Sequence, residues 1–385
     1  MIDLDFSRLK SLNATSIEKS LCQNLSSIAS RYELSVTLSS SSPNDALNVL
    51  VEALYNKYGR VAILIDEYDH AILSTLHSPQ LNEVLKIIQS FFVTVKSLGE
   101  YVHFLFITGV SEFAKAGLFS GMNNPKNLSM NLEYACVCGY TEEEVDRYFV
   151  PYLEKMAKQK NTTVNDLRAE LKKLYNGYCF SENAPTVYNP FSFINTLDSC
   201  KTGNFWFDSG APSFLIEILK KEYAKGNTSI FHVEEFHMSE MEPKCFDVSA
   251  IPLPSLMQQT GYLTIKSFSK GLYTLGFPNL EVQAALQRYM MDILLNLGLN
   301  EISNFSTELL GALTEENMEK LISLLKTLCS HVPSKLHISK EKFYHALLIL
   351  CAANIALQGG VKSADDVVAF FLVRVESAAL LYTVE

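Results

Sequence analysis

The sequence predicts an α/β protein whose first domain contains a largely parallel sheet. Two short apolar runs, at 61–65 and 102–107, have the length and composition of strands that are buried on both faces. A segment with apolar residues at helical spacing separates them, and strands that alternate with helices are typical of α/β layers. Because 385 residues exceed one ordinary core, we expect roughly two to three domains.

The first domain is predicted at 1–140, with strands separated by largely helical segments. The first strand candidate alternates apolar and acidic residues, the next two are continuous apolar runs, and Gly139 closes the last. The strand candidates are 2–6, 61–65, 102–107 and 134–137.

A mostly helical region is predicted at 141–298. Thr141 and Glu144 form a capping-box pattern at the start of its first helix. The buried stripe predicted for that helix is Val145, Tyr148, Phe149 and Tyr152. Further along, Gly177 is predicted to end a helix in a left-handed conformation, and 273–279 reads as a strand end and a turn.

The last region is predicted at 305–385, after a linker at 299–304. It has an apolar helix at about 341–357 and two β-rich runs at 367–373 and 378–384. The whole sequence therefore predicts an α/β sheet domain, a helical region and an α+β end.

The composition narrows the class of protein. A net charge of −10 disfavours a general attraction to nucleic acid, although it is compatible with a local basic groove. No apolar run approaches the roughly 20 residues that span a bilayer, and no signal peptide is visible, so we expect a cytoplasmic chain. The eight scattered cysteines do not have the spacing of a disulfide framework or a zinc site.

The second strand candidate ends in Asp66 and Glu67. An apolar strand that ends in Asp-Glu is the Walker B pattern of P-loop ATPases, in which the Asp holds Mg²⁺ and the Glu polarises the attacking water. The carboxyl ends of parallel strands meet at one edge of the sheet, where ligands bind. The alternative is a strand end whose two acidic side chains simply face solvent.

Thr108 ends the next strand candidate, 42 residues after Asp66. Many such ATPases place a polar sensor of the γ-phosphate at this point, and Ser111 is a second candidate. The alternative for both residues is a hydroxyl that ends a strand or caps the following turn.

A phosphate-binding loop of the form Gly-x-x-x-x-Gly-Lys-Ser/Thr is not found in the sequence. No Gly-Lys dipeptide occurs, and Gly59 is the only glycine before the strand that starts at Val61. Such a loop wraps the phosphates with backbone amides and reaches their oxygens with its lysine.

Taken together, these motifs resemble the bacterial AAA-ATPase-like proteins that carry a PD-(D/E)XK-type nuclease domain at the C-terminus. The resemblance covers roughly residues 1 to 290 well and the remainder poorly. The matching stretches are 64–69, 108–113, 118–124, 175–178, 187–192, 206–215, 259–265 and 273–279.

The resemblance implies a P-loop-NTPase-like sheet and a winged-helix-like element in the helical region. It implies ATP and Mg²⁺ as cofactors, with Asp66 as the Mg²⁺ residue, Glu67 as the catalytic base, and Thr108 or Ser111 as the nucleotide sensor. It also implies action coupled to nucleic acid, and a protein partner stays an open alternative.

Family members carry a Gly-Lys-Ser loop upstream of the segment that matches Ile2 to Ser7, so this sequence begins beyond it. The strand that leads into that loop lies beside the sensor strand in this class of ATPase. Without it, we expect that the remaining strands close up or that the chain is a fragment or a degenerate copy.

The nuclease of the family needs an Asp before one strand and a Glu-x-Lys on the next. Asp365 resembles the first part and Glu385 the approach to the second, with the Lys falling beyond the last residue. We therefore expect an incomplete nuclease-like end, and a degenerate or truncated ATPase-like protein that does not hydrolyse ATP alone. The alternative is an active nucleotide hydrolase whose phosphate loop is restored or supplied by another chain.

Overall fold

A computed structural model describes the chain at 1–9, 13–76, 78–111, 125–208, 213–224, 236–239, 252–295, 299–315 and 317–331. The chain divides into two compact units. The first consists of Met1–Leu128, His237–Thr260 and Ser269–Tyr273. The second contains Ser129–Phe236, Gly261–Phe268 and the residues from Thr274.

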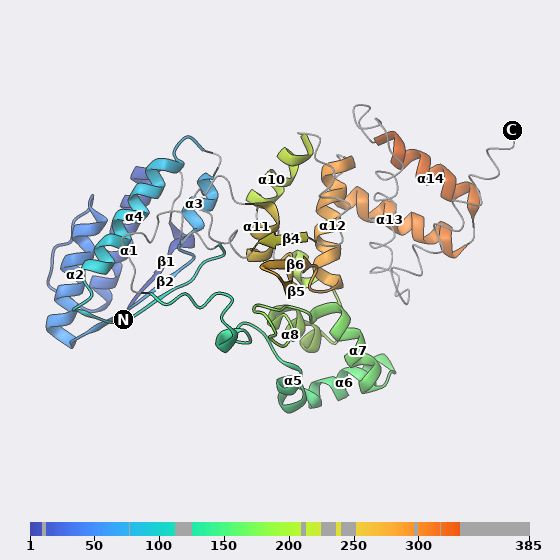
Figure 1. The fold of residues 1–385 in the computed structure, drawn as a ribbon, viewed down its shortest axis with the longest axis horizontal. Helices are drawn as coiled ribbons and strands as arrows, with labels where there is room; N and C mark the ends of the chain where they lie inside the picture. The colour runs from blue at the N-terminus through green and yellow to red at the C-terminus, as the bar shows by residue number, and fades with distance from the viewer. Residues whose placement is uncertain are drawn as a thin grey trace. The chain divides into compact units, whose positions relative to one another are not determined.

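The first unit is built on a parallel sheet of three strands in the order β1-β2-β3. Figure 1 labels β1 and β2 of this sheet, together with helices α1 to α4. The α/β prediction and the first three strand predictions are confirmed. The strands are β1 (Ile2–Asp5), β2 (Val61–Asp66) and β3 (Val102–Ile107).

Helices cover one face of this sheet. The alternation along each strand sends Ile2 and Leu4 of β1, and Ile63 and Ile65 of β2, to the same face, where all four are buried. The long helices of the unit contribute apolar stripes to this core, for example Leu47, Leu50 and Leu54 of α2 (Pro43–Tyr58). The helices of the unit are α1 (Ala14–Arg31), α2 (Pro43–Tyr58), α3 (His70–Thr75) and α4 (Leu81–Ser97) with the short 3₁₀ helix η1 (Phe6–Arg8), and α11 (Leu253–Gln259).

The other face of the sheet is apolar but incompletely covered. Phe104 and Phe106 of β3 lie there beside Ala62 and Leu64, and their side chains are 52% and 43% exposed. The two rings stack with centroids 6.2 Å apart. Parallel sheets normally have both faces covered. Among the residues that the structure describes, no strand pairs with the outer edge of β3, so the described strands do not close up into a fully covered sheet.

The strand predicted at Tyr134 to Val137 is wrong. Leu132–Tyr134 form a 3₁₀ helix, η3, whose N-cap Asn131 accepts a hydrogen bond from the amide of Glu133. Val137 is 73% exposed, so it does not have the burial that a strand inside a parallel sheet requires.

Helices dominate the second unit, as predicted. They are α5 (Glu142–Tyr148), α6 (Val150–Lys160), α7 (Val164–Tyr175), α8 (Pro190–Ser199), α9 (Phe205–Asp208), α10 (Ser213–Ala224), α12 (Leu280–Leu295), α13 (Leu299–Thr314) and α14 (Met318–His331). The structure also describes a second sheet, which is not confined to the residues of one unit. Its order is β4-β6-β5, with β4 (Phe236–Ser239), β5 (Thr264–Ser269) and β6 (Leu272–Gly276).

The capping box of Thr141 and Glu144 is confirmed, but the stripe behind it is only partly buried. Val145 is buried, whereas Tyr148 and Tyr152 are more than half exposed. The reason is a break at Phe149, where α5 ends and α6 begins with Pro151 in its first turn. Because the helix is interrupted there, the residues that face the core differ from those expected of one continuous helix.

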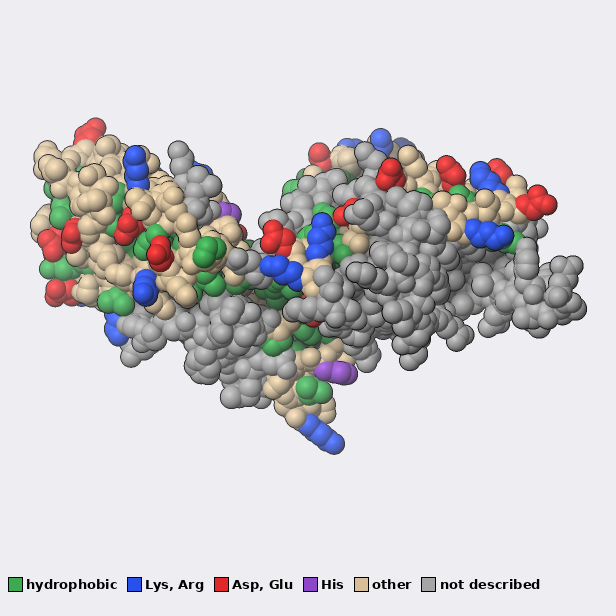
Figure 2. All heavy atoms as spheres, turned by 90° about the horizontal axis from the view of Figure 1, so that it is seen from above, with side chains coloured by type: hydrophobic (Ala, Val, Ile, Leu, Met, Phe, Trp, Pro, Cys, Tyr) green, Lys and Arg blue, Asp and Glu red, His purple; other side chains and the backbone are tan. Residues whose placement is uncertain are grey.

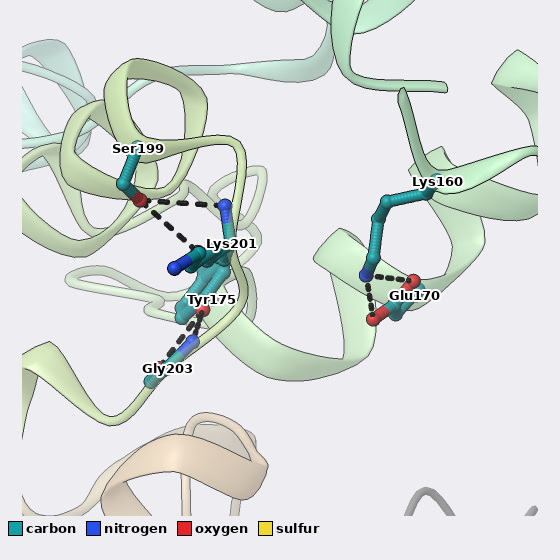
Figure 3. A network of polar contacts seen from close by, with 6 residues as sticks. All are labelled: Lys160, Glu170, Tyr175, Ser199, Lys201 and Gly203. Carbon is teal, nitrogen blue, oxygen red and sulfur yellow. Dashed lines mark hydrogen bonds and ion pairs between the residues drawn. The ribbon is translucent and has the colours of Figure 1, made fainter. Parts of the chain in front are cut away.

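The predicted helix end is confirmed, because α7 ends at Tyr175 and Gly177, just beyond the C-cap Asn176, has a positive φ of +115°. A Cβ atom at this position would lie 1.9 Å from the carbonyl oxygen of Pro278. Nearby, the hydroxyl of Tyr175 accepts a hydrogen bond from the amide of Gly203 and donates one to its carbonyl oxygen (Figure 3).

Two further predictions concern the later part of the chain. The turn at 273–279 is confirmed, because β6 ends at Gly276 and α12 begins at Leu280. The segment predicted as a linker at 299–304 is the first part of α13, whose buried stripe includes Ile302 and Leu309. The apolar helix at 341–357, both β-rich runs, Asp365 and Glu385 lie outside the described residues, and the incomplete nuclease-like end stays a prediction.

Candidate functional site at the carboxyl edge of the parallel sheet

The register of the sheet brings the ends of its three strands to one edge. Asp5 of β1 lies opposite Asp66 of β2, and Ile65 of β2 lies opposite Ile107 of β3. The amide of Thr108 donates a hydrogen bond of 2.8 Å to the carbonyl oxygen of Ile65, which extends the ladder by one residue beyond β3. Thr108 therefore stands beside Asp66 at the carboxyl edge.

The side chains of Asp66 and Thr108 are in direct contact. The hydroxyl of Thr108 donates a hydrogen bond to Oδ1 of Asp66, and the amide of Glu67 donates another to the same oxygen at 3.0 Å. The predicted position of Asp66, at the carboxyl edge of a parallel sheet and close to Thr108, is confirmed. Asp66 is exposed, so its carboxylate is accessible from solvent.

Glu67 has an unusual backbone at the same edge. Its φ is +53°, in the left-handed region that few residues other than glycine adopt. Burial raises the pKa of its carboxyl group, and the negative charges of Asp69, Asp66 and Asp5 raise it further. A carboxylate with a raised pKa is a stronger base than an exposed glutamate, as expected of a group that accepts a proton.

Ser111 is held in a different way from Thr108. It is buried, and its hydroxyl donates a hydrogen bond to Oδ2 of Asp69, to which its amide also donates at 2.6 Å. The hydroxyl of Ser111 is thus turned toward Asp69. Of the two predicted sensor candidates, only Thr108 contacts Asp66.

Asp69 is the residue of this site to which the sequence assigned no role. It lies at the N-cap of α3 yet makes no capping hydrogen bond with its side chain. Its oxygens instead accept from Val110 and Ser111, and its carboxyl group is fully buried. An Asp three residues after the strand end is the only signal of this in the sequence, because the contact joins segments 42 residues apart.

The exposed groups at the edge fit a magnesium ion in chemical type. Carboxylate and hydroxyl oxygens are hard ligands, and Mg²⁺ in phosphate-transfer sites takes only one or two carboxylates, with phosphates and waters filling the other positions. Within the part of the chain that is described, no cluster of three or more His, Cys, Asp or Glu residues is placed to hold a metal ion. The exposed Asp66 is a carboxylate of the type that such a site uses.

Comparisons with known proteins found a family match in the part of the chain that contains the parallel sheet. A family model described as "Predicted AAA-ATPase" matches residues 1–119, which include the parallel sheet. The parallel sheet is consistent with an NTPase-like fold.

A curated relative is also similar to the chain. It is the "Uncharacterized protein in vnfD 5′ region" of Azotobacter chroococcum mcd 1, 33% identical over 237 residues. The match covers 60% of this chain but 43% of the relative, so the chain spans less than half the length of that protein. No solved structure matches.

The face of the molecule shown in Figure 2 carries charged side chains of both signs. On the face shown in Figure 2, basic and acidic side chains are interspersed, whereas nucleic-acid backbones bind to clustered positive charge. None of the helices in the described ranges is long and apolar enough to cross a membrane.

Proposed function

We propose that the first unit carries the metal-holding and water-orienting half of an ATP-hydrolysing site. Asp66 is the residue that holds Mg²⁺, Glu67 is the catalytic base, and Thr108 is the sensor that contacts the γ-phosphate. The observation that carries the proposal is the contact between Asp66 and Thr108 at the carboxyl ends of adjacent parallel strands. The match of residues 1–119 to a predicted AAA-ATPase family supports the choice of nucleotide.

Each side chain has a separate task in this proposal. The chemistry that Mg²⁺ supplies in such sites is neutralisation of charge on the phosphate oxygens. Both described hydrogen bonds to Asp66 end on Oδ1, so Oδ2 is the oxygen that would bind the metal ion. Glu67 has a raised pKa that favours acceptance of a proton from water. Thr108 donates its single hydroxyl proton to Asp66 in this structure, and on nucleotide binding the hydroxyl would turn from Asp66 to an oxygen of the γ-phosphate.

We further propose that the phosphate-binding half is a strand, a glycine-rich loop and a helix that add to the outer edge of β3. The 385 residues contain no Gly-Lys dipeptide, so in this proposal the loop is supplied by another chain or by an extension of this one. The strand would pair with β3, and the helix would cover Phe104 and Phe106, which are 52% and 43% exposed. Covering these two rings contributes roughly 1 kcal/mol each.

This arrangement explains why the apolar face ends at the site. Leu64 and Asp66 alternate onto the same face of β2, and Phe106 and Thr108 onto the same face of β3. A helix that covers Leu64 and Phe106 would therefore have one end beside Asp66 and Thr108. Helix N-termini bind phosphate groups through their free amides, so the same element would both cover the face and hold the nucleotide.

The proposal predicts that the 385-residue chain hydrolyses ATP no faster than its Glu67→Gln variant. The variant keeps the size of the side chain and removes its basicity. Steady-state phosphate release with Mg²⁺ and ATP measures both rates. Turnover by the chain alone that Glu67→Gln abolishes would show that the phosphate-binding half is already present, which contradicts this proposal.

The active alternative is tested with a longer chain. The DNA that precedes the Met1 codon is read for an in-frame Gly-x-x-x-x-Gly-Lys-Ser/Thr, and the extended chain is expressed. We expect hydrolysis that depends both on the loop lysine and on Glu67. An extended chain with the loop but with a rate that Glu67→Gln does not change would overturn the assignment of the base.

A further inference from the structure

We propose that Asp69 is a positioning residue, whose buried carboxylate holds the segment Thr108–Ser111 in place so that the hydroxyl of Thr108 stays on Asp66. Only its importance for catalysis rests on the proposed function. The placement of Thr108 itself does not depend on any nucleotide.

The contacts of Asp69 are directed away from its own helix. A residue at a helix N-cap normally uses its side chain to accept from amides in the first turn of that helix. Asp69 makes no such bond in α3. Instead, Oδ1 accepts from the amide of Val110 at 3.1 Å, and Oδ2 accepts from the amide and the hydroxyl of Ser111. A single carboxylate thus binds the backbone amides of Val110 and Ser111, which follow β3 closely, and the hydroxyl of Ser111.

Tyr68 grips the same segment at two further points. Its amide donates to the carbonyl oxygen of Thr108 at 3.1 Å, and its hydroxyl donates to the carbonyl oxygen of Ser111 at 2.7 Å. The segment is therefore held at both of its ends. Since Tyr68 and Asp69 closely follow Asp66 in the chain, this grip fixes Thr108 relative to Asp66.

Gly109 allows this close approach. A Cβ atom there would lie 2.6 Å from both Oδ1 of Asp69 and the ring of Tyr68. Real Cβ atoms do not come so close to other heavy atoms, and the carboxylate is fully buried with little room to move. A side chain at position 109 would therefore force Asp69 or Tyr68 to shift.

Burial of the Asp69 carboxylate costs free energy, because the charged group loses its contacts with water. A buried carboxylate needs hydrogen-bond donors to offset its loss of solvent. Asp69 receives three donors from residues 110 and 111. Removal of the carboxylate would leave the buried amide of Ser111 and the partly buried amide of Val110 without an acceptor, so the segment is expected to change its conformation.

The test follows the side chain of Thr108 rather than the stability of the protein. The full chain is labelled at its threonine methyl groups for NMR, and the Thr108 signal is assigned with Thr108→Val. We expect Asp69→Asn to move that signal by more than its linewidth or to split it. The amide of the variant accepts from Val110, but its NH₂ group meets the amide donor of Ser111.

Matched variants separate placement from general loss of stability. Val84→Ala removes fully buried apolar volume from α4 in the same unit and should leave the Thr108 signal unchanged. Tyr68→Phe removes one hydroxyl of the grip and should shift the signal less than Asp69→Asn does. It also keeps the test decisive if Asp69→Asn does not fold. An unchanged Thr108 signal in a folded Asp69→Asn, or failing that in Tyr68→Phe, would overturn the proposal.

A second measurement tells this proposal apart from the proposed function. Mg²⁺ and ATP are added to the labelled chain with and without the loop-bearing extension. A Thr108 signal that moves in Asp69→Asn but never responds to Mg²⁺ and ATP would retain Asp69 as a positioning residue and reject the nucleotide site. A signal that responds to the nucleotide but not to Asp69→Asn would do the reverse.

Discussion

The hydroxyl of Thr108 donates a hydrogen bond to the carboxylate of Asp66, although the two residues are 42 positions apart in the sequence. Parallel pairing of β2 and β3 makes this contact, since both residues lie at the ends of strands whose carboxyl ends coincide. The contact links the two strand-end segments of the candidate site. Its contribution is open to direct measurement.

Thr108→Val is expected to destabilise the first unit by about 0.5–1.5 kcal/mol, the usual net value of one hydrogen bond. Valine keeps the shape of the side chain and removes the donor. Hydrogen–deuterium exchange of a peptide from β2 measures the effect within this unit. Thr94→Val in α4 is the control, because its hydroxyl donates to the carbonyl oxygen of Ser90 in the same helix at 3.1 Å and not to another strand or loop among the described residues. Equal effects of the two changes would contradict a specific contact with Asp66.

Glu67→Gly is expected to be more stable than Glu67→Ala by about 1 kcal/mol. The φ of +53° imposes a steric cost on any residue with a Cβ atom, and glycine does not have that cost. Exchange of the same β2 peptide compares the two variants, with Glu67→Gln as the control that keeps both the strain and the length of the side chain. A Glu67→Gly that is less stable than Glu67→Ala would show that the left-handed conformation costs nothing here.

The sequence predicted the edge of the site better than its interior. The apolar runs fixed where β2 and β3 end, so Asp66 and Thr108 could be placed together from the sheet alone. Asp69 could not be recognised, because an aspartate after a strand is ordinarily read as a helix cap. Its actual partners, Val110 and Ser111, depend on tertiary packing that no local pattern records.

Dependence on tertiary packing also explains why two local predictions in the second unit were wrong or only partly right. Tyr134 to Val137 has the composition of a strand, but a strand forms only where a neighbouring strand is available to pair with it. Asn131 caps a 3₁₀ helix there instead. The stripe around Tyr148 and Tyr152 was predicted from one continuous helix, and the break at Phe149 turns both side chains outward.

Tyr175→Phe is expected to destabilise the second unit by about 1–3 kcal/mol. The phenol oxygen both accepts from the amide of Gly203 and donates to its carbonyl oxygen, so its removal leaves two backbone groups without their partner. Trp206 is the single tryptophan of the chain and lies in this unit, so its fluorescence during urea unfolding measures the change. Tyr148→Phe, at a tyrosine that is 57% exposed, is the control and should change the midpoint little.

The stability of the second unit is expected to depend on pH through Glu142. Its carboxylate accepts from Lys172 at 2.8 Å and from Arg168 at 3.3 Å, and the hydroxyl of Tyr188 donates to it at 3.2 Å. Partial burial acts to raise the pKa of Glu142, but these donors and the two positive charges outweigh it, so the pKa is lowered.

A carboxyl group with a lowered pKa in the folded state stabilises that state above its unfolded pKa, and the contribution disappears as the pH falls through the folded value. Glu142→Gln should therefore be less stable than the unchanged chain at pH 7, on the order of 1 kcal/mol given its partial exposure. The two proteins should converge below about pH 4, since an unfolded glutamate has a pKa of about 4.3. Urea unfolding followed by Trp206 fluorescence, repeated from pH 7 downward, measures the difference.

Glu143→Gln is the matched control, because Glu143 is an exposed residue in the same first turn of α5 and experiences the same helix dipole. A difference between Glu142→Gln and the unchanged chain that stays constant down to acidic pH, or that Glu143→Gln reproduces, would show that the charge of Glu142 does not stabilise this unit through Lys172 and Arg168.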